Sequence, residues 1–210
     1  MSWTICGLFA LVAYFLGSLP TGYLMAKSLK GIDIRECGSG STGATNVLRT
    51  VGKEAAIAVL AIDILKGAIA LLLVREFYLM TGGNILSLSW QPWLITFAGI
   101  LAILGHSKSI WLQFKGGKSV ATSLGVLLVM NPWVALGTMA VFGLVLVARH
   151  IVSLGSICGA IAVNILMVAL HQPLPYCLFA AIAGIYVILR HRSNIERLLA
   201  GIEPAIGRQL

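Results

Sequence analysis

Apolar residues along the chain occur in long runs that are separated by short polar connectors. Runs of this length and apolarity are typical of helices that cross a bilayer, which need about 20 apolar residues each. The pattern therefore predicts an all-α, polytopic membrane protein with about seven transmembrane helices, in a single integral membrane domain over residues 1–210. The runs lie at about residues 3–26, 55–78, 90–105, 119–131, 133–148, 152–170 and 174–190.

The apolar stretch from Ser119 to Ala148 allows two interpretations. The tripeptide Asn131-Pro132-Trp133 lies near its middle, and proline cannot continue a hydrogen-bonded helix. A break there leaves pieces of about 13 and 16 residues, which are short against the roughly 20 that a crossing needs. The alternative is one long, tilted helix.

Charge favours the seven-span interpretation. Only 10% of the residues are charged and 59% are hydrophobic, whereas soluble domains carry about 25% charged residues. With seven spans, thirteen of the fifteen Lys and Arg residues fall on one face, and six spans weaken this asymmetry. The positive-inside rule then places the N-terminus outside and the C-terminus in the cytoplasm, with some helices short or broken. It also accounts for the net charge of +8 without a nucleic-acid partner. The thirteen residues are Lys27, Lys30, Arg35, Arg49, Lys53, Lys108, Lys115, Lys118, Arg149, Arg190, Arg192, Arg197 and Arg208.

The same topology gathers the polar segments on the predicted cytoplasmic face, while the outward connectors are neutral or nearly so. Four polar segments at one membrane surface predict one shared site. They cover residues 38–53, 105–122, 149–156 and 190–203.

The first polar segment, GSGSTG at 38–43, has the chemistry of an anion-binding turn. Glycine lets backbone N–H groups converge on an anion. Hydroxyl donors follow in Ser39, Ser41, Thr42 and Thr45, and the guanidinium of Arg49 suits phosphate. The segment is not a Walker A sequence. No strand precedes its G-x-G-x-x-G letters, so a dinucleotide site is not predicted.

The second segment repeats this chemistry in FKGGKS, where Lys115 and Lys118 flank two glycines. If Ser119 opens the next span, a helix N-terminus also faces the anion. The alternative is that both segments are ordinary turns whose lysines only mark topology. Two such loops on one face favour a site for two phosphate groups, or for one substrate and one leaving group.

Several ionisable residues lie outside these loops. His191 and Asn194 stand at i and i+3 and would share a helix face, with His191 as a base, a phosphate ligand or an interfacial residue. Asp63 and Lys66 lie inside a predicted span, where charges are usually functional; they form a structural ion pair or the floor of the site. His106 follows a span and caps its end. The cysteines, at positions 6, 37, 158 and 177, predict neither a disulfide framework nor a metal site.

Four segments closely resemble the signature regions of the bacterial membrane glycerol-3-phosphate acyltransferases that use acyl phosphate. They are GSGSTGATNVLR, GHSKSIWLQFKGGKSVAT, VSLGS and HRSNIERLLAGIE, in the family's order. The resemblance implies transfer of an acyl group from a fatty acyl phosphate to the 1-hydroxyl of sn-glycerol 3-phosphate. The products would be lysophosphatidic acid and phosphate, in the first acylation of phospholipid synthesis. It implies no cofactor and no metal, and a multi-pass protein of the bacterial inner membrane whose active site faces the cytoplasm. The implied partners are the two substrates, membrane lipid and an upstream enzyme that forms acyl phosphate.

The resemblance also assigns residues by position. Two departures from the family pattern stand out: Ser41 replaces a common asparagine, and Lys108 occupies a position where proline is common. Ser41 still offers a donor, so phosphate binding should survive. The implied catalytic residues are Ser39, Lys118, His191 and Asn194. The implied substrate-binding residues are Gly38, Gly40, Ser41, Thr45, Asn46, Arg49, Gly116, Gly117, Ser153 and Glu203.

No histidine in the chain is followed by aspartate in the H-x-x-x-x-D spacing of the soluble-type acyltransferases. We therefore expect the departing donor phosphate to accept the proton, while the protein supplies position and charge. One alternative is an organic-phosphate transporter, supported by the charges inside the second span. Another is a CDP-dependent phosphotransferase, whose acidic metal cluster is missing. Covalent catalysis through Cys37 is a third.

Overall fold

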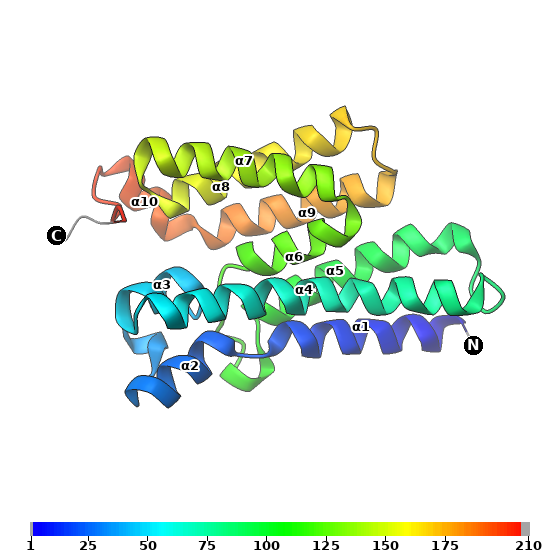
Figure 1. Cartoon of the computed structure of the whole chain (residues 1–210), viewed down its shortest axis with the longest axis horizontal. Helices are drawn as coiled ribbons and strands as arrows, with labels where there is room; N and C mark the ends of the chain where they lie inside the picture. Colours follow the sequence, from blue (N-terminus) through cyan, green and yellow to red (C-terminus); the bar gives the residue numbers. More distant parts are fainter. Residues whose placement is uncertain (1, 207–210) are drawn as a thin grey trace. The chain divides into compact units, whose positions relative to one another are not determined.

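The computed structural model describes residues 2–206, and Arg208 of the cytoplasmic set therefore lies outside them. Within this range the chain is all-helical and has no β-strand, which confirms the predicted fold class. Two compact units follow one another, the first ending at Met130 and the second beginning at Asn131. The elements are α1 (Ser2–Ser18), α2 (Thr21–Lys30), η1 (Ile34–Glu36), α3 (Ala44–Thr50), α4 (Lys53–Thr81), η2 (Leu88–Trp90), α5 (Gln91–Ser107), η3 (Ile110–Leu112), α6 (Val120–Met130), α7 (Pro132–Arg149), α8 (Val152–Ala169), α9 (Leu174–Arg190) and α10 (Arg192–Leu199) (Figure 1).

Each predicted apolar run is helical in the structure. Within residues 2–206, five helical stretches are long and apolar enough to cross a membrane. A sixth results if α9 and α10, which are bent by 59° at their junction, form one span. Helix α6 has only 11 residues. The protein is thus an integral membrane protein with several apolar helices, and seven crossings and their orientation stay predictions.

Proline separates two of the predicted runs and divides a third. Between α6 and α7, Asn131 accepts hydrogen bonds through Oδ1 from the backbone N–H groups of Trp133 (2.9 Å) and Val134 (3.1 Å). This capped break at Asn131 replaces the alternative of one long helix. The run at 3–26, predicted as one span, is also broken, because α1 ends before Leu19 and Pro20 and α2 begins after them. Pro20 has no N–H to donate, so the α1 helix cannot continue through it.

Glycine allows the helices of the first unit to approach closely. A Cβ on Gly17 of α1 would collide with the Ala102 carbonyl of α5, and one on Gly105 of α5 would collide with the Tyr14 carbonyl of α1. Helices α4 and α6 repeat this reciprocal arrangement at Gly67 and Gly125. Small residues serve this purpose in membrane proteins because lipid supplies no hydrophobic force between helices. Figure 1 shows α1, α4 and α5 side by side.

The second unit is a bundle of α7, α8 and α9. Gly155 of α8 lies against Phe142 of α7, and Gly184 of α9 lies against Ala160 of α8. Large apolar side chains remain exposed on α7, with Leu144 72% and Val147 75% exposed. Such faces suit lipid rather than water, in agreement with an integral membrane protein.

Candidate functional site

The first glycine loop, residues 31–43, is organised by one buried amide. Asn46, 2% exposed at the start of α3, accepts a hydrogen bond through Oδ1 from the Ser39 backbone N–H (3.0 Å). Its Nδ2 donates to the carbonyls of Cys37 (2.9 Å), Ser41 (2.9 Å) and Ile34 (3.3 Å). The amide therefore fixes the path of the loop on either side of Ser39.

Two glycines of this loop adopt backbone conformations that other residues avoid. Gly38 has φ of +56° and Gly40 has φ of +67°, both left-handed. A Cβ on Gly38 would also collide with the Asn46 Oδ1 atom. Glycine is required here by the turn itself, and the turn leaves Ser39 exposed between the two glycines.

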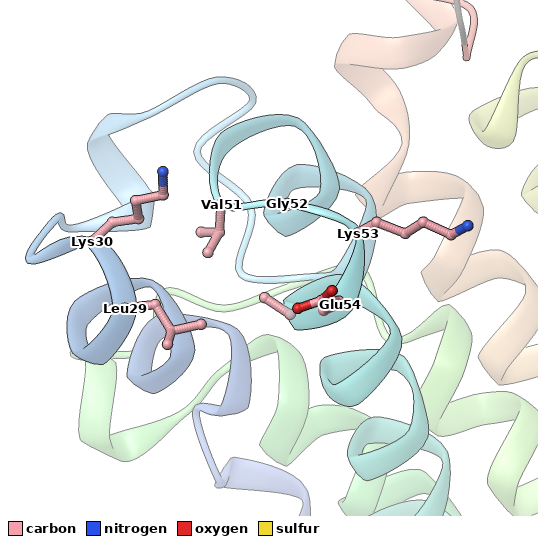
Figure 2. Close-up of a pocket in the computed structure, with 7 residues that line it drawn as sticks. Leu29, Lys30, Val51, Gly52, Lys53 and Glu54 are labelled. Atoms are coloured by element: carbon pink, nitrogen blue, oxygen red, sulfur yellow. The ribbon is translucent and has the colours of Figure 1, made fainter.

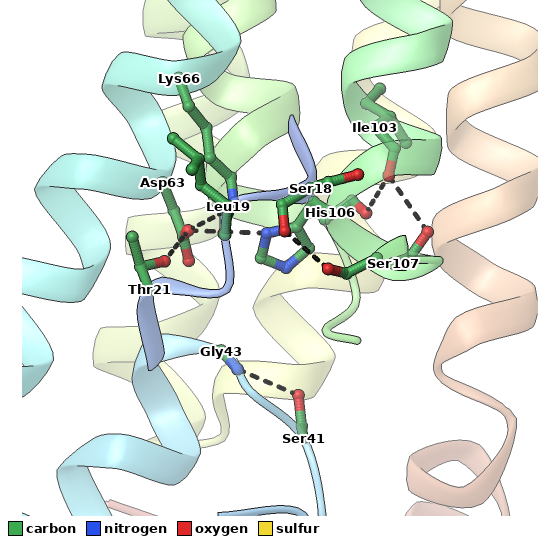
Figure 3. Close-up of polar contacts among 12 residues, drawn as sticks. Ser18, Leu19, Thr21, Ser41, Gly43, Asp63, Lys66, Ile103, His106 and Ser107 are labelled. Carbon is green, nitrogen blue, oxygen red and sulfur yellow. Dashed lines mark hydrogen bonds and ion pairs between the residues drawn. The ribbon is translucent and has the colours of Figure 1, made fainter. Parts of the chain in front are cut away.

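The remaining predicted residues of the first segment differ in exposure. Ser41 Oγ accepts a hydrogen bond from the Gly43 N–H (3.3 Å), an Asx-like turn made by a serine (Figure 3). Thr45 is half-buried in the first turn of α3, whereas Arg49 is exposed in its last turn. Ser39 and Arg49 are thus the most accessible of the predicted groups in this segment.

Asp33 and Arg35 form a salt bridge within the first loop, and Arg35 also contacts the second polar segment. Asp33 caps η1 through Oδ1, which accepts from the Arg35 N–H (2.9 Å), and Arg35 Nη2 pairs with Asp33 Oδ2 (2.6 Å). The hydrogen bond from the Arg35 side chain lowers the pKa of the Asp33 carboxyl to about 2. Arg35 Nη1 also donates to the Leu112 carbonyl of η3 (3.5 Å). The first glycine loop therefore contacts η3, which precedes the second glycine loop in the chain.

The second glycine loop lies directly on His106 of α5. The Gly117 N–H donates to the His106 carbonyl (3.3 Å). A Cβ on Gly116 would collide with that carbonyl, and one on Gly117 would collide with the imidazole Nε2. Neither glycine has positive φ, so close approach, rather than a left-handed turn, requires glycine at both positions. Lys118, half-buried, follows immediately.

Ser119 directly precedes α6, as predicted, but its side chain has a structural role. Its Oγ donates to the Ile103 carbonyl (2.8 Å), and the residue is only 1% exposed. Its φ of +64° lies in the left-handed region. The hydroxyl is therefore engaged within the fold, while a role of the α6 N-terminus in binding the anion stays a prediction.

A buried polar cluster lies beneath the second loop (Figure 3). Asp63 Oδ1 accepts from Thr21 Oγ1 (2.6 Å) and pairs with Lys66 Nζ (2.9 Å), which confirms the predicted i,i+3 pairing. Lys66 also donates to the Leu19 carbonyl at the α1–α2 break (3.0 Å). His106 Nδ1 lies 3.6 Å from Asp63 Oδ1. His106 is only 6% exposed in the last turn of α5, and its predicted role at the end of this helix stays a prediction.

In the second unit, Glu203 joins three predicted or neighbouring side chains. Its Oε1 accepts from Ser153 Oγ (2.7 Å) and Asn194 Nδ2 (2.6 Å), and its Oε2 accepts from Arg197 Nε (2.6 Å). Burial alone would raise the pKa of the Glu203 carboxyl, but these hydrogen bonds and the Arg197 charge lower it on balance. The Ile206 N–H donates to the His150 carbonyl (2.7 Å). The chain after α10 therefore returns to the junction between α7 and α8.

His191 occupies the bend between α9 and α10. It is 3% exposed, and its Nδ1 lies 2.8 Å from the Val187 carbonyl. His191 is the N-cap of α10, where its carbonyl accepts from the Ile195 N–H (2.9 Å), and Asn194 follows three residues later in the same helix. Ser153, Asn194 and Glu203 form one cluster, and His191 lies at the start of the helix that carries Asn194.

A hollow of about 290 Å³ lies between the end of α2 and the start of α4 (Figure 2). None of its lining residues is among the predicted catalytic or substrate-binding residues. They are Leu29, Lys30, Val51, Gly52, Lys53, Glu54 and Ala55. Within residues 2–206, no group of three or more His, Cys, Asp or Glu residues is placed to hold a metal ion.

Comparison with known proteins identifies the family of this chain. Residues 7–201 match the family model described as glycerol-3-phosphate acyltransferase. The chain belongs to the glycerol-3-phosphate acyltransferase family. The glycerol-3-phosphate acyltransferase of Rippkaea orientalis is 63% identical over 100% of this chain and 97% of its own, and that of Crocosphaera subtropica is 58% identical over 100% and 98%.

The fold matches solved members of the same family. A crystal structure of PlsY, an integral membrane glycerol 3-phosphate acyltransferase, in its glycerol 3-phosphate form has a TM-score of 0.85 and 37% identity, covering 96% of each chain. The lysophosphatidic acid form of PlsY has a TM-score of 0.82 at the same identity, covering 96% of this chain and 95% of that one. These findings confirm the resemblance seen in the sequence and show that the chain is an acyltransferase.

The acyltransferase distributes its predicted residues over both units. The first unit holds both glycine loops, and the second holds Ser153, His191, Asn194 and Glu203. Two contacts were not predicted from the sequence: the hydrogen bond from Arg35 to the Leu112 carbonyl and the packing of the second glycine loop against His106. The first contact joins residues 77 positions apart, which no local pattern reveals. For the second, the charged pair Asp63 and Lys66 inside a span was a visible signal that a polar residue such as His106 lies nearby, because buried charges need partners.

Proposed function

We propose that this acyltransferase moves the acyl group of a fatty acyl phosphate to the 1-hydroxyl of sn-glycerol 3-phosphate. The 1-oxygen attacks the acyl carbon, the bond to the phosphate oxygen breaks, and lysophosphatidic acid and inorganic phosphate result. Family membership over residues 7–201 carries the proposal. The two PlsY structures, described by their glycerol 3-phosphate and lysophosphatidic acid forms, support this substrate and product.

In this proposal the two glycine loops bind the two phosphates. Ser39 and Lys118 hold the donor phosphate or the developing oxyanion, and Arg49 holds glycerol 3-phosphate together with Asn194 and His191. Gly38, Gly40, Ser41, Thr45, Asn46, Gly116 and Gly117 shape the two turns, and Ser153 and Glu203 support Asn194. The exposure of Ser39 and Arg49 supports these roles, because a charged substrate has to reach them from water.

The donor phosphate is the proposed proton acceptor. The pair of His106 and Asp63 is the one His–carboxylate contact among residues 2–206 that resembles a base and its partner. Gly117 covers the imidazole Nε2 of this histidine, however, so the ring cannot reach a substrate hydroxyl. An acyl phosphate is already activated, and its leaving phosphate lies close to the attacking hydroxyl. Protein groups then contribute position and electrostatic stabilisation.

The transporter alternative depended on charges inside the second span. Asp63 and Lys66 are 1% and 3% exposed and hydrogen-bond to Thr21 and the Leu19 carbonyl. These contacts of Asp63 Oδ1 and Lys66 Nζ support a structural role over a path for ions or organic phosphates. The proposed location is the bacterial inner membrane, with the loops facing the cytoplasm, where an upstream enzyme supplies the acyl phosphate.

A donor comparison tests the proposal. Purified protein in detergent receives radiolabelled glycerol 3-phosphate with either palmitoyl phosphate or palmitoyl-CoA, in the presence of a chelator. We expect lysophosphatidic acid from palmitoyl phosphate alone. Product from palmitoyl-CoA but not from palmitoyl phosphate would refute the donor assignment. Uptake into sealed liposomes without a lipid product would favour the transporter.

A further inference from the structure

Two charged side chains and a histidine lie buried at a place that the proposed chemistry does not use. Asp63, Lys66 and His106 are 1%, 3% and 6% exposed. Asp63 receives Thr21 and Lys66 at hydrogen-bonding distance, and His106 Nδ1 lies 3.6 Å from the same oxygen (Figure 3). A separation of 3.6 Å places the imidazole beside the carboxylate, beyond the ordinary distance of a hydrogen bond. Burying a carboxylate is unfavourable unless it is paired, so the cluster calls for an explanation.

The pairing of Asp63 with Lys66 explains only part of the cluster. Lys66 has a second structural role, because it also donates to the Leu19 carbonyl at the break between α1 and α2. That carbonyl also accepts from the Thr21 N–H (3.0 Å). Neither interaction requires a histidine beside the carboxylate.

His106 connects the cluster to the second glycine loop. Its carbonyl accepts from the Gly117 N–H, and its imidazole Nε2 occupies the space that a Gly117 side chain would need. The ring therefore limits where Gly117 can lie, and the His106 carbonyl limits where Gly116 can lie. Lys118 follows in the chain and takes its position from them.

We propose that Asp63 and His106 are positioning residues, which hold the loop at 115–119 so that Lys118 meets the donor phosphate. Asp63 orients the imidazole at its Nδ1 side, and the Nε2 side of the imidazole packs against Gly117. The assignment of Lys118 to the donor rests on the proposed function, whereas the support of the loop rests on contacts alone. A displacement of about 1 Å in a positioning group can reduce the rate about 100-fold.

The test uses the double variant Asp63→Asn/Lys66→Met in the full-length protein. Asparagine keeps the acceptor for Thr21, and no unpaired buried charge remains, so folding should be retained. Hydrogen–deuterium exchange follows the amides of residues 115–119 without any substrate. Steady-state kinetics give KM for palmitoyl phosphate and for glycerol 3-phosphate. Gly117→Ala disturbs the same contact from the loop side and replaces the double variant if the latter fails to fold.

We expect faster exchange at residues 115–119, and a KM for palmitoyl phosphate raised about 10-fold or more, with the KM for glycerol 3-phosphate unchanged. The control is Asn164→Leu, which removes a polar side chain from α8 and should change neither measurement. Unchanged exchange in the double variant and in Gly117→Ala would overturn the proposal. Faster exchange with equal changes in both KM values would overturn the link to the donor. If the wild type does not use palmitoyl phosphate, the proposed function fails, and the exchange measurement still decides whether Asp63 and His106 support the loop.

Discussion

The Asn46 amide makes four hydrogen bonds inside the first loop and leaves Ser39 exposed at its turn. The resemblance placed this asparagine among the substrate contacts. Because Asn46 is only 2% exposed, its burial supports a role in shaping the loop before substrate binds, rather than in contacting the substrate. A buried amide that donates to three carbonyls restricts the loop backbone more than a single hydroxyl in the loop does.

Asn46→Asp separates this role from simple loss of volume. The carboxylate can still accept from the Ser39 N–H, but it faces the three carbonyl oxygens to which Nδ2 donated, of which those of Cys37 and Ile34 keep a backbone donor and that of Ser41 loses its amide donor. Each buried group left without a partner costs about 1–3 kcal/mol. We expect a lower thermal midpoint in detergent and loss of most activity. An Asn46→Asp protein with wild-type stability would contradict the role of Asn46 in shaping the loop.

Single substitutions also test the proposed anion ligands. Ser39→Ala, Arg49→Ala and Lys118→Ala should each lower kcat/KM about 100-fold or more while the protein still inserts into membranes, because preorganised groups that stabilise developing charge contribute that much. Cys37→Ser is the matched control in the same loop and should be silent. Full activity in Lys118→Ala would remove that residue from the site, and an inactive, folded Cys37→Ser would revive covalent catalysis.

The segment that carries Glu203 gives the second unit a pH-dependent element. Because the pKa of the Glu203 carboxyl is lowered in the fold, its contribution is present above the ordinary value of 4.5 and is lost as the pH falls through and below that value. We expect the thermal midpoint to fall below about pH 4.5, and Glu203→Gln to flatten this dependence and to destabilise the protein at pH 7 by about 1–3 kcal/mol. A wild-type pH dependence in Glu203→Gln would show that other carboxylates are responsible.

Helix contacts in the first unit depend on missing side chains. Gly125→Ala should push α6 away from α4 and destabilise the protein by about 1–3 kcal/mol, since its Cβ would meet the Ile64 carbonyl. The control is Gly143→Ala in α7, where no atom lies within 4 Å of the added Cβ. It should be neutral or stabilising by up to about 1 kcal/mol. Equal destabilisation by both substitutions would contradict the close-contact explanation.

Sequence patterns predicted the helices better than the contacts between their ends. Long apolar runs and the Asn131-Pro132 signal were sufficient for α4 to α9, because both act locally. The break at Pro20 was missed because hydrophobicity continues through it on both sides. The structural role of the Ser119 hydroxyl could not be predicted, because its partner, the Ile103 carbonyl, lies on a preceding helix and no local sequence pattern indicates that contact.

At the level of the whole molecule, charge asymmetry predicted which connectors lie together. The Arg35 contact with Leu112 agrees with this for the two glycine loops. In the second unit, the segments at 149–156 and 190–203 meet through Ser153, Asn194 and Glu203. Each of these contacts lies within one unit. That the polar segments of both units face the same side of the membrane is therefore still a prediction, and it is the central one.

Side-specific labelling tests that claim most directly. Single cysteines replace the exposed residues Glu36, Lys115, Arg192 and Asn84 in an active protein whose four native cysteines are serine. An impermeant maleimide is then applied to intact and to permeabilised cells. We expect Glu36→Cys, Lys115→Cys and Arg192→Cys to react only after permeabilisation, and Asn84→Cys to react in intact cells. Reaction of Lys115→Cys or Arg192→Cys from the side opposite to Glu36→Cys would contradict a single cytoplasmic site.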